Sequence, residues 1–225
     1  MISIDAVYQK VLALANKEQR GYITPQQFNL FADQAQKEIF EQYFYDVNQF
    51  GRTPGNSKEY SDIMDNLSEK IAIFETLGTI GGNNINAPGL YRLGTVDNSG
   101  VEIEEVQLNE LMQINNSPLT RPSIIRPVYV RTGETTIDIF PVSITTATCS
   151  YIRTPAVPSW GYFVVGNKAL HDTSNLKTVN FELHPSEESE LVYKILKFAG
   201  ISMDKINIMR AGQVQEQAQV QQEKQ

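Results

Sequence analysis

The sequence predicts an α+β protein, in which an N-terminal helical bundle is completed by a C-terminal helix and interrupted by a β-rich insertion. Two patterns support this fold class. Apolar residues recur every three or four positions up to residue 74, and they alternate with polar residues in short runs between residues 90 and 181. Seven of the last fifteen residues are glutamine, with no apolar stripe. We therefore expect an extended C-terminal arm that becomes ordered on a partner.

The first predicted helix begins near Ile4 and ends before Arg20-Gly21. Its apolar stripe consists of Ile4, Val7, Val11 and Leu14. A second helix begins after Thr24, which can cap it, and Pro25 suits its first position. Gln27 stands three residues after Thr24 and completes a capping box.

The second helix carries two apolar stripes, which predicts burial from two sides, within a bundle or between subunits. These stripes are Phe28, Phe31, Ala35 and Ile39, and Phe40, Phe44 and Val47. A third helix has the stripe Ile63, Leu67, Ile71 and Phe74. The glycine- and asparagine-rich stretch 78–89 indicates a connector that ends the helical part.

Two hairpins are expected in the β-rich part. Asp97-Asn98-Ser99-Gly100 suits the turn of the first, and Thr132-Gly133-Glu134 lies between the two runs of the second. A further strand is expected over 147–153, a short helix over 107–115, and a rigid loop around Pro155, Pro158, Trp160 and Gly161.

The last predicted helix begins at Ser186 as its cap and ends at Gly200. Its first turn holds Glu187, Glu188 and Glu190, which favour the positive end of the helix dipole. The predicted domains are a helical bundle of residues 1–80 and 184–202, a β-rich domain of residues 88–182, and a docking arm of residues 203–225.

Composition excludes several classes of function. The 225 residues include 26 acidic and 19 basic side chains, a formal net charge of −7, which argues against a protein that wraps nucleic acid. The single cysteine excludes an internal disulfide framework and favours a reducing compartment. No apolar run approaches membrane-spanning length and no secretory signal is visible, so we expect a product of the cytoplasm.

Motifs for catalysis or cofactor binding are not found. His171 and His184 lack partners at zinc-ligand spacing, and Cys149 stands in a strand-like context typical of a buried thiol. A calcium loop over 16–27 would place Arg20 at a ligand position, and Gly78–Gly82 lacks the lysine of a phosphate loop. Glu102, Glu104 and Glu105 are expected on an exposed strand rather than as an acid–base pair. We therefore expect no enzyme, no cofactor and no metal.

Aromatic residues crowd the second helix. Five aromatic residues fall between positions 40 and 50, too many for one face of a small bundle. They fit either a well-filled core or subunit interfaces, where aromatic side chains are enriched. We favour interfaces, for which the expected residues are Phe40, Tyr43, Phe44 and Phe50.

The order of several segments resembles a known family. VYQKVLALANKEQRGYITPQQFNLFADQAQKEIFEQYF is followed by YRLGTV, SPLTRPSIIRPVYVR, TIDIFPVSITTATCSYIRTPAVPSW and FELHPSEESELVYKILKFAGI. Over residues 3–210 this order resembles the head-to-tail connector proteins of short-tailed bacteriophages, also called adaptor, ring or tail tubular proteins. The likeness lies in the overall pattern, because no catalytic signature accompanies it.

The resemblance implies a dodecameric ring in the virion, bound beneath the portal protein and extending the channel for DNA ejection. The helical part would form the ring wall and the arm would dock on the portal, through Met203, Ile206, Ile208, Met209, Val214 and Val220. The β-rich part would face tail components, through Arg121, Arg126, Arg131 and Trp160. Acidic residues of the helical part are expected to line the channel, so that DNA passes without sequence-specific binding.

Two other assignments remain open. A tail completion protein or a minor capsid protein is the nearest alternative within the virion. An assembly chaperone belongs to another class, because it would be absent from the mature particle.

Overall fold

The protein is a mixed α+β chain, as the sequence predicts, and its computed structural model divides into two compact units. The structure describes residues 1–17, 23–51, 58–166, 168–172, 177–202, 214 and 217–218. We call residues 1–73 with 155–225 the helical unit and residues 74–154 the sheet unit. The chain therefore leaves the helical unit once and returns to it.

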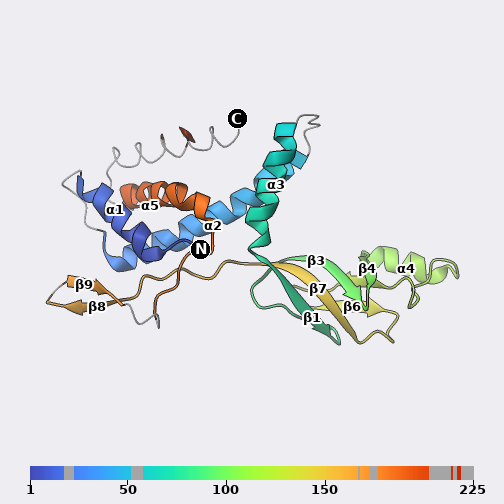
Figure 1. Ribbon diagram of the computed structural model, residues 1–225. Helices are drawn as coiled ribbons and strands as arrows, with labels where there is room; N and C mark the ends of the chain where they lie inside the picture. The colour runs from blue at the N-terminus through green and yellow to red at the C-terminus, as the bar shows by residue number, and fades with distance from the viewer. Residues whose placement is uncertain are drawn as a thin grey trace. The chain divides into compact units, whose positions relative to one another are not determined.

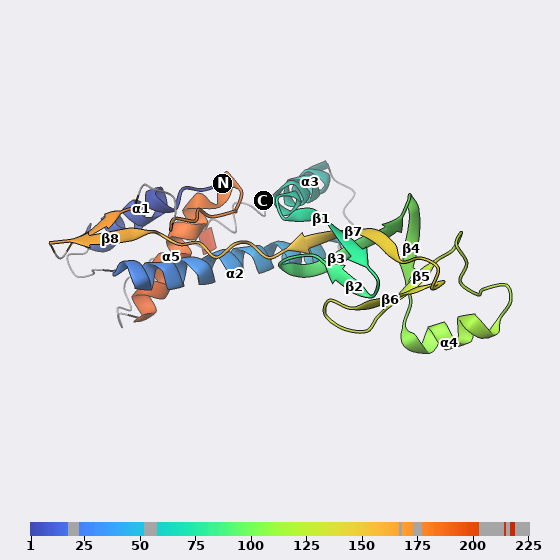
Figure 2. The ribbon, with the colours of Figure 1, turned by 90° about the horizontal axis from the view of Figure 1, so that it is seen from below.

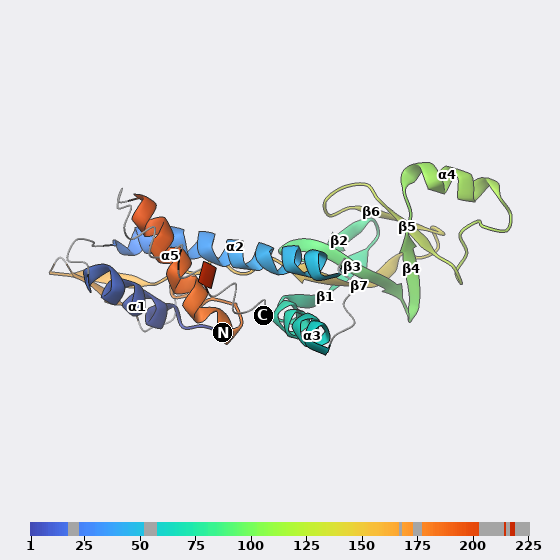
Figure 3. The same cartoon turned by 90° about the horizontal axis from the view of Figure 1, so that it is seen from above.

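The helical unit is built around α2 and α5, which pack against each other (Figure 1). Its helices are α1 (Ile4–Lys17), α2 (Pro25–Gly51), α3 (Lys58–Ala72) and α5 (Glu188–Ser202), and a 3-10 turn, η1 (Pro185–Glu187), precedes α5. Figure 3 shows α5 crossing α2, with α1 beside it. Side chains of α1, α2 and α5 fill the core of this unit, among them Ile4, Phe28, Ile39, Leu191 and Ile195.

The start of α2 confirms the predicted capping box. The backbone N–H of Gln27 donates to Oγ1 of Thr24 at 3.3 Å, and the backbone N–H of Thr24 donates to Oε1 of Gln27 at 3.1 Å. These two bonds satisfy donors that a helix N-terminus leaves without intrahelical partners. The helix therefore begins at Pro25 for the reason that the sequence indicates.

The C-terminal helix begins and ends differently from the prediction. His184, and not Ser186, is the N-cap of η1, since its Nδ1 accepts the backbone N–H of Ser186. Gly200 does not end α5, which continues to Ser202. Gly200 is buried, so the small residue lies inside the packed helix instead of at its end.

Residues 155–182 belong to the helical unit, although the sequence places them in the β-rich domain. Gln36, fully buried on α2, holds this segment with its amide group. Its Nε2 donates to the Ala156 carbonyl at 2.8 Å, and its Oε1 accepts the Glu182 N–H at 3.1 Å. In the described part of this segment, β8 (Tyr162–Val165) pairs with β9 (Lys168–His171) as a hairpin, which forms a separate two-stranded sheet.

The sheet unit contains one seven-stranded sheet in the order β2-β1-β7-β3-β4-β5-β6. Its strands are β1 (Glu75–Gly81), β2 (Asn84–Asn86), β3 (Leu90–Asn98), β4 (Val101–Glu105), β5 (Val128–Arg131), β6 (Ile137–Phe140) and β7 (Thr146–Arg153). Only the β4–β5 pair is parallel. The two ends of the order meet, because Ile85 donates to Thr135 at 2.8 Å and Ile137 donates to Asn83 at 3.0 Å. This contact pairs the edges that would otherwise attract other strands.

Two apolar clusters hold the sheet unit together. The larger one lies inside the curved sheet and includes Ile80, Val96, Tyr129, Ile139 and Cys149. The smaller one joins β5 to the helix α4 (Leu108–Asn116), and it consists of Val106, Leu111, Val128 and Val130. Figure 2 shows α4 at the end of this unit that also holds β5. The two clusters place alternate residues of β5 on opposite faces, as strand geometry requires.

The stretch predicted as a connector is instead two strands of this sheet. Gly78 lies on β1 opposite Cys149, and a Cβ atom there would stand 3.1 Å from the Sγ atom of Cys149. The glycine therefore permits close packing and does not mark a linker. The predicted turns at 97–100 and 132–134 are confirmed, since β3–β4 and β5–β6 pair as antiparallel hairpins around them.

Candidate functional site

A cavity of about 380 Å³ lies in the helical unit between α2, α3 and the start of the last helix. Its apolar wall is formed by Ile39, Tyr43, Ile63 and Leu67, and its polar lining by Gln42, Asp46, Asn66, Glu69, Lys70, His184, Ser186, Glu187 and Glu190. The volume falls within the range of ordinary ligand pockets. Among the described residues, four carboxylates but only one lysine line it, so this part of the lining is acidic.

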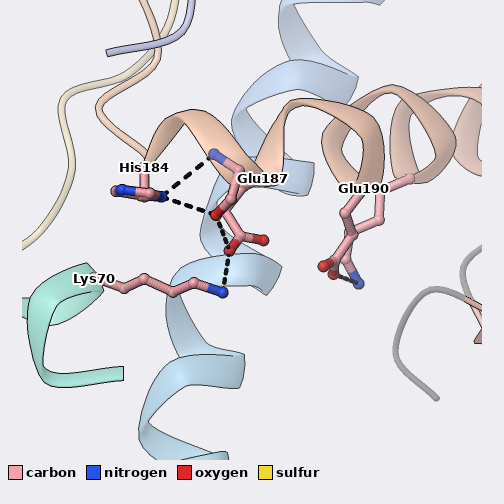
Figure 4. Close-up of polar contacts among 6 residues, drawn as sticks. Lys70, His184, Glu187 and Glu190 are labelled. Atoms are coloured by element: carbon pink, nitrogen blue, oxygen red, sulfur yellow. Dashed lines mark hydrogen bonds and ion pairs between the residues drawn. The ribbon is translucent and has the colours of Figure 1, made fainter. Parts of the chain in front are cut away.

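One ion pair joins α3 to η1 at this cavity (Figure 4). The Nζ atom of Lys70 lies 2.5 Å from Oε1 of Glu187, whose side chain is only 1% exposed. The same ammonium lies 5.8 Å from the ring centroid of Tyr43, a cation–π distance. A buried carboxylate without a cation would be strongly destabilising, so Lys70 compensates the charge that the fold places there.

His184 caps the start of the last helix and contacts Ser186. Nδ1 of His184 accepts the backbone N–H of Ser186 and lies 2.8 Å from its Oγ atom, and that hydroxyl also contacts Oε1 of Glu187 at 3.3 Å. Because Nδ1 already accepts from the helix start, the ring has the role of an N-cap. This geometry supports anchoring of the last helix.

A second buried pair continues the polar cluster along α5. Lys194 lies 3.4 Å from Glu190, four residues before it, and 3.9 Å from Glu38 on α2. Both Lys194 and Glu190 are buried. The sequence predicts only a helix-dipole role for Glu187 and Glu190, and the pairing of Glu187 with Lys70 follows from the approach of α3 to η1. The i, i+4 spacing of Glu190 and Lys194 was the one visible signal.

The sheet unit exposes an apolar turn between α4 and β5. The backbone N–H of Ser123 donates to the Arg126 carbonyl at 3.2 Å, and the N–H of Arg126 donates to the Ser123 carbonyl at 3.1 Å. Ile124 and Ile125 therefore occupy the tip, 67% and 83% exposed. We call Ser123–Arg126 the isoleucine turn. Tight turns usually carry glycine, asparagine or aspartate, so the two exposed isoleucines make this tip a candidate binding surface.

The β8–β9 hairpin is a second exposed apolar surface, in the helical unit. It exposes Phe163, Val164, Val165 and Leu170. Val164 and Val165 are neighbours on one strand, so they point to opposite faces and both faces are apolar. A two-stranded hairpin with two apolar faces is marginal in water by itself. Contact with another molecule would stabilise it.

The residues expected at subunit interfaces lie mainly inside the chain. Phe40 and Tyr43 are buried, Phe44 is half-buried, and Phe40 and Phe44 pack edge to face at 5.0 Å. The side chain of Phe50 lies outside the described residues. For the two buried residues, the core interpretation of the aromatic cluster therefore holds.

The residues expected to face the tail differ in exposure, since the three arginines are exposed and Trp160 is buried. Arg121 and Arg126 are exposed, and Arg131 donates to the carbonyls of Gly133 and Glu134 in its own hairpin turn. Trp160 differs from the expectation, because it belongs to the helical unit and is 2% exposed. Its indole Nε1 donates to Asp5 at 2.9 Å, so it anchors the loop on α1.

The expected portal-docking residues fall mostly outside the described part of the chain. Met203, Ile206, Ile208, Met209 and Val220 lie there, and Val214 is described and exposed. These residues remain a prediction from the sequence.

Metal and membrane signals are absent from the described residues. They contain no group of three or more histidine, cysteine or acidic side chains placed to hold a metal ion. None of the described helices combines the length and apolar character that a membrane crossing needs.

No protein-family model matches the chain, and a comparison with curated proteins gives no significant match.

Proposed function

We propose that the chain is a non-enzymatic structural protein of a bacteriophage virion, a ring-forming adaptor that joins the portal to the tail and extends the channel for DNA ejection. The observation that carries this proposal is the exposure of large apolar side chains on both units, at the isoleucine turn and at both faces of the β8–β9 hairpin. Such surfaces are rare on monomers that act alone and are typical of subunits in assemblies.

In this proposal the four helices form a bundle that α5 completes, and the bundle is the wall of a dodecameric ring. Its net charge supports this role. Residues 1–73 with 155–225 carry 18 acidic and 14 basic side chains, a balance of −4, and the whole chain carries −7. An acidic lumen repels phosphate and lets DNA slide. The sheet unit faces the tail, and the arm of residues 203–225 docks on the portal.

The nearest alternative is another neck or tail protein, such as a tail completion or minor capsid protein. An assembly chaperone would use the same exposed apolar surfaces but would leave before the particle matures. No observation favours either over the adaptor, and both differ from it in where the protein is found.

Location in the particle tests the proposal. Gold-labelled antibodies against the chain, applied to purified virions and to tails separated from heads, are expected to mark the junction between head and tail. Labelling at the capsid surface or at the distal end of the tail would contradict the adaptor. Absence of the chain from purified particles would point to the chaperone.

A further inference from the structure

The isoleucine turn has the features of a preformed binding element. Its two reciprocal backbone hydrogen bonds define the turn, and Pro122 and Pro127 flank it directly. Proline restricts the backbone of the free chain, so little conformational entropy remains to be lost on binding. The tip presents two branched apolar side chains, Ile124 and Ile125, to a binding partner.

Arginines stand on either side of the tip. Arg121 and Arg126 are exposed, and neither guanidinium has an ion-pair partner among the described residues. From residue 111 to residue 133 the chain contains three arginines and no acidic side chain, whereas the chain as a whole is acidic. The turn is therefore a basic, apolar projection, and its complement is an apolar pocket with an acidic rim.

The cavity of the helical unit combines apolar walls with carboxylates in its lining. Ile39, Tyr43 and Leu67 supply apolar walls, and Asp46 and Glu69 contribute carboxylates to the lining. Glu69 is exposed and has no ion-pair partner within the described ranges. Lys70 is the one lysine that the described residues contribute to the lining, and it is paired with Glu187, so its charge does not oppose an incoming arginine.

We infer that the isoleucine turn of one copy inserts into the cavity of a neighbouring copy, with Arg121 and Arg126 against the carboxylates of Asp46 and Glu69. The inference rests on the proposed ring and names the surfaces that join its subunits. The turn and the cavity are different surfaces of the chain. Each copy therefore inserts its turn into one neighbour and binds the turn of another neighbour in its own cavity. A contact of this heterologous kind generates a ring when its rotation closes.

Cysteine pairing between separate chains tests this contact directly. One full-length chain carries Ile125→Cys at the tip, and the other carries Asn66→Cys, an exposed position on the cavity lining. After the two are mixed and oxidised, the expected product is the heterodimer of the two chains, at least about tenfold above either homodimer. Wild type is the background control, because burial raises the pKa of the Cys149 thiol and covers it.

Charge reversal separates this contact from accidental pairing. Arg121→Glu with Arg126→Glu is expected to lower the heterodimer yield about tenfold, and Glu69→Lys on the receiving chain is expected to restore part of it. Arg92→Glu is the matched control, since Arg92 is an exposed arginine elsewhere in the sheet unit. Equal yields from all combinations, or homodimers in excess of the heterodimer, would overturn the inference.

The same pairing, repeated on the portal, distinguishes this contact from the adaptor role. Pairing in free solution by a chain that ignores the portal would contradict the adaptor and leave the contact standing. A portal-bound ring that forms without cysteine pairing would contradict the contact and leave the adaptor role standing. Loss of tail attachment in Arg121→Glu/Arg126→Glu, with pairing unaffected, would assign the turn to a tail protein and overturn the inference.

Discussion

The helical unit and the sheet unit differ in where their charged side chains lie. In the helical unit, Glu187, Glu190 and Lys194 are buried, and Lys70 and Lys194 lie within ion-pair distance of these glutamates. In the sheet unit, Arg121 and Arg126 stand exposed beside an apolar tip. Removing either partner of a buried ion pair strongly destabilises the fold, whereas exposed charges contribute little to its stability. The buried ion pairs therefore hold the helical unit together, whereas the exposed arginines of the sheet unit are available for binding.

Each unit also carries its own probe. The single tryptophan, Trp160, is buried in the helical unit, and the single cysteine, Cys149, is buried in the sheet unit. Tryptophan fluorescence therefore reports unfolding of one unit, and thiol protection reports opening of the other.

The largest effect is expected from Glu187→Ala, which removes the buried carboxylate that lies 2.5 Å from the Lys70 ammonium. Because the Lys70 side chain is 18% exposed, it can recover part of its hydration. We expect the free energy of unfolding of the helical unit to fall by about 2–3 kcal/mol, measured by urea titration of Trp160 fluorescence. Protection of Cys149 should not change.

Glu188→Ala is the matched control for this substitution. Glu188 is the next residue, and its pair with Lys10 at 2.6 Å is open to solvent. Its removal is expected to lower the free energy of unfolding by less than about 1 kcal/mol. Equal losses in the two variants would contradict the distinction between buried and exposed pairs.

A smaller loss is expected from Thr24→Ala, which removes one half of the capping box of α2. The Oγ1 acceptor of the Gln27 N–H disappears, so the free energy of unfolding should fall by about 1 kcal/mol by the same fluorescence titration. Thr24→Ser keeps the acceptor and should retain most of the stability. A Ser variant as unstable as the Ala variant would argue against the cap.

The sheet unit is expected to lose stability at alkaline pH. Burial raises the pKa of Cys149, so its contribution is fully present below the ordinary thiol pKa of about 8.5. As the pH rises past that value the unfolded thiol ionises while the folded one stays protonated, and stability is lost. Urea unfolding by circular dichroism at pH 7.5 and pH 10 should show a smaller alkaline loss in Cys149→Ala than in wild type.

The smallest effect on folding is expected from Arg121→Glu with Arg126→Glu. Neither side chain has an ion-pair partner within the described part of the chain, so the free energy of unfolding should change by less than about 0.5 kcal/mol. Thiol protection of Cys149 is the measurement. A large loss would mean that the arginines support the sheet unit, and it would remove the basis for assigning them to binding.

Local signals explain what could be predicted from the sequence. The capping box at Thr24 and the hairpin turns at 97–100 and 132–134 depend on neighbouring residues, and all of them are confirmed. The strand β1 was missed because its glycines suit a linker equally well. Its partner β7 lies about 70 residues later, and only that pairing reveals why Gly78 must be small.

The candidate site was less predictable. The residues that line the cavity come from α2, α3 and η1, so no residue spacing within one segment of the sequence indicates the cavity. Trp160 was assigned to the tail-facing surface because the predicted β-rich domain of residues 88–182 included it, yet its contacts with Asp5 and Asn29 come from the first two helices. Tyr43 was assigned to an interface because aromatic residues crowd α2. The fold buries Tyr43 instead, on the wall of the cavity.

The most direct test of the adaptor is the mass of the full-length chain in solution, alone and after mixing with the portal protein of the same phage. The account predicts a complex that contains one closed ring per portal, with the dodecameric copy number that the family resemblance implies. Arg121→Glu/Arg126→Glu should bind the portal without completing the ring. A wild-type chain whose mass is unchanged by the portal would contradict the account.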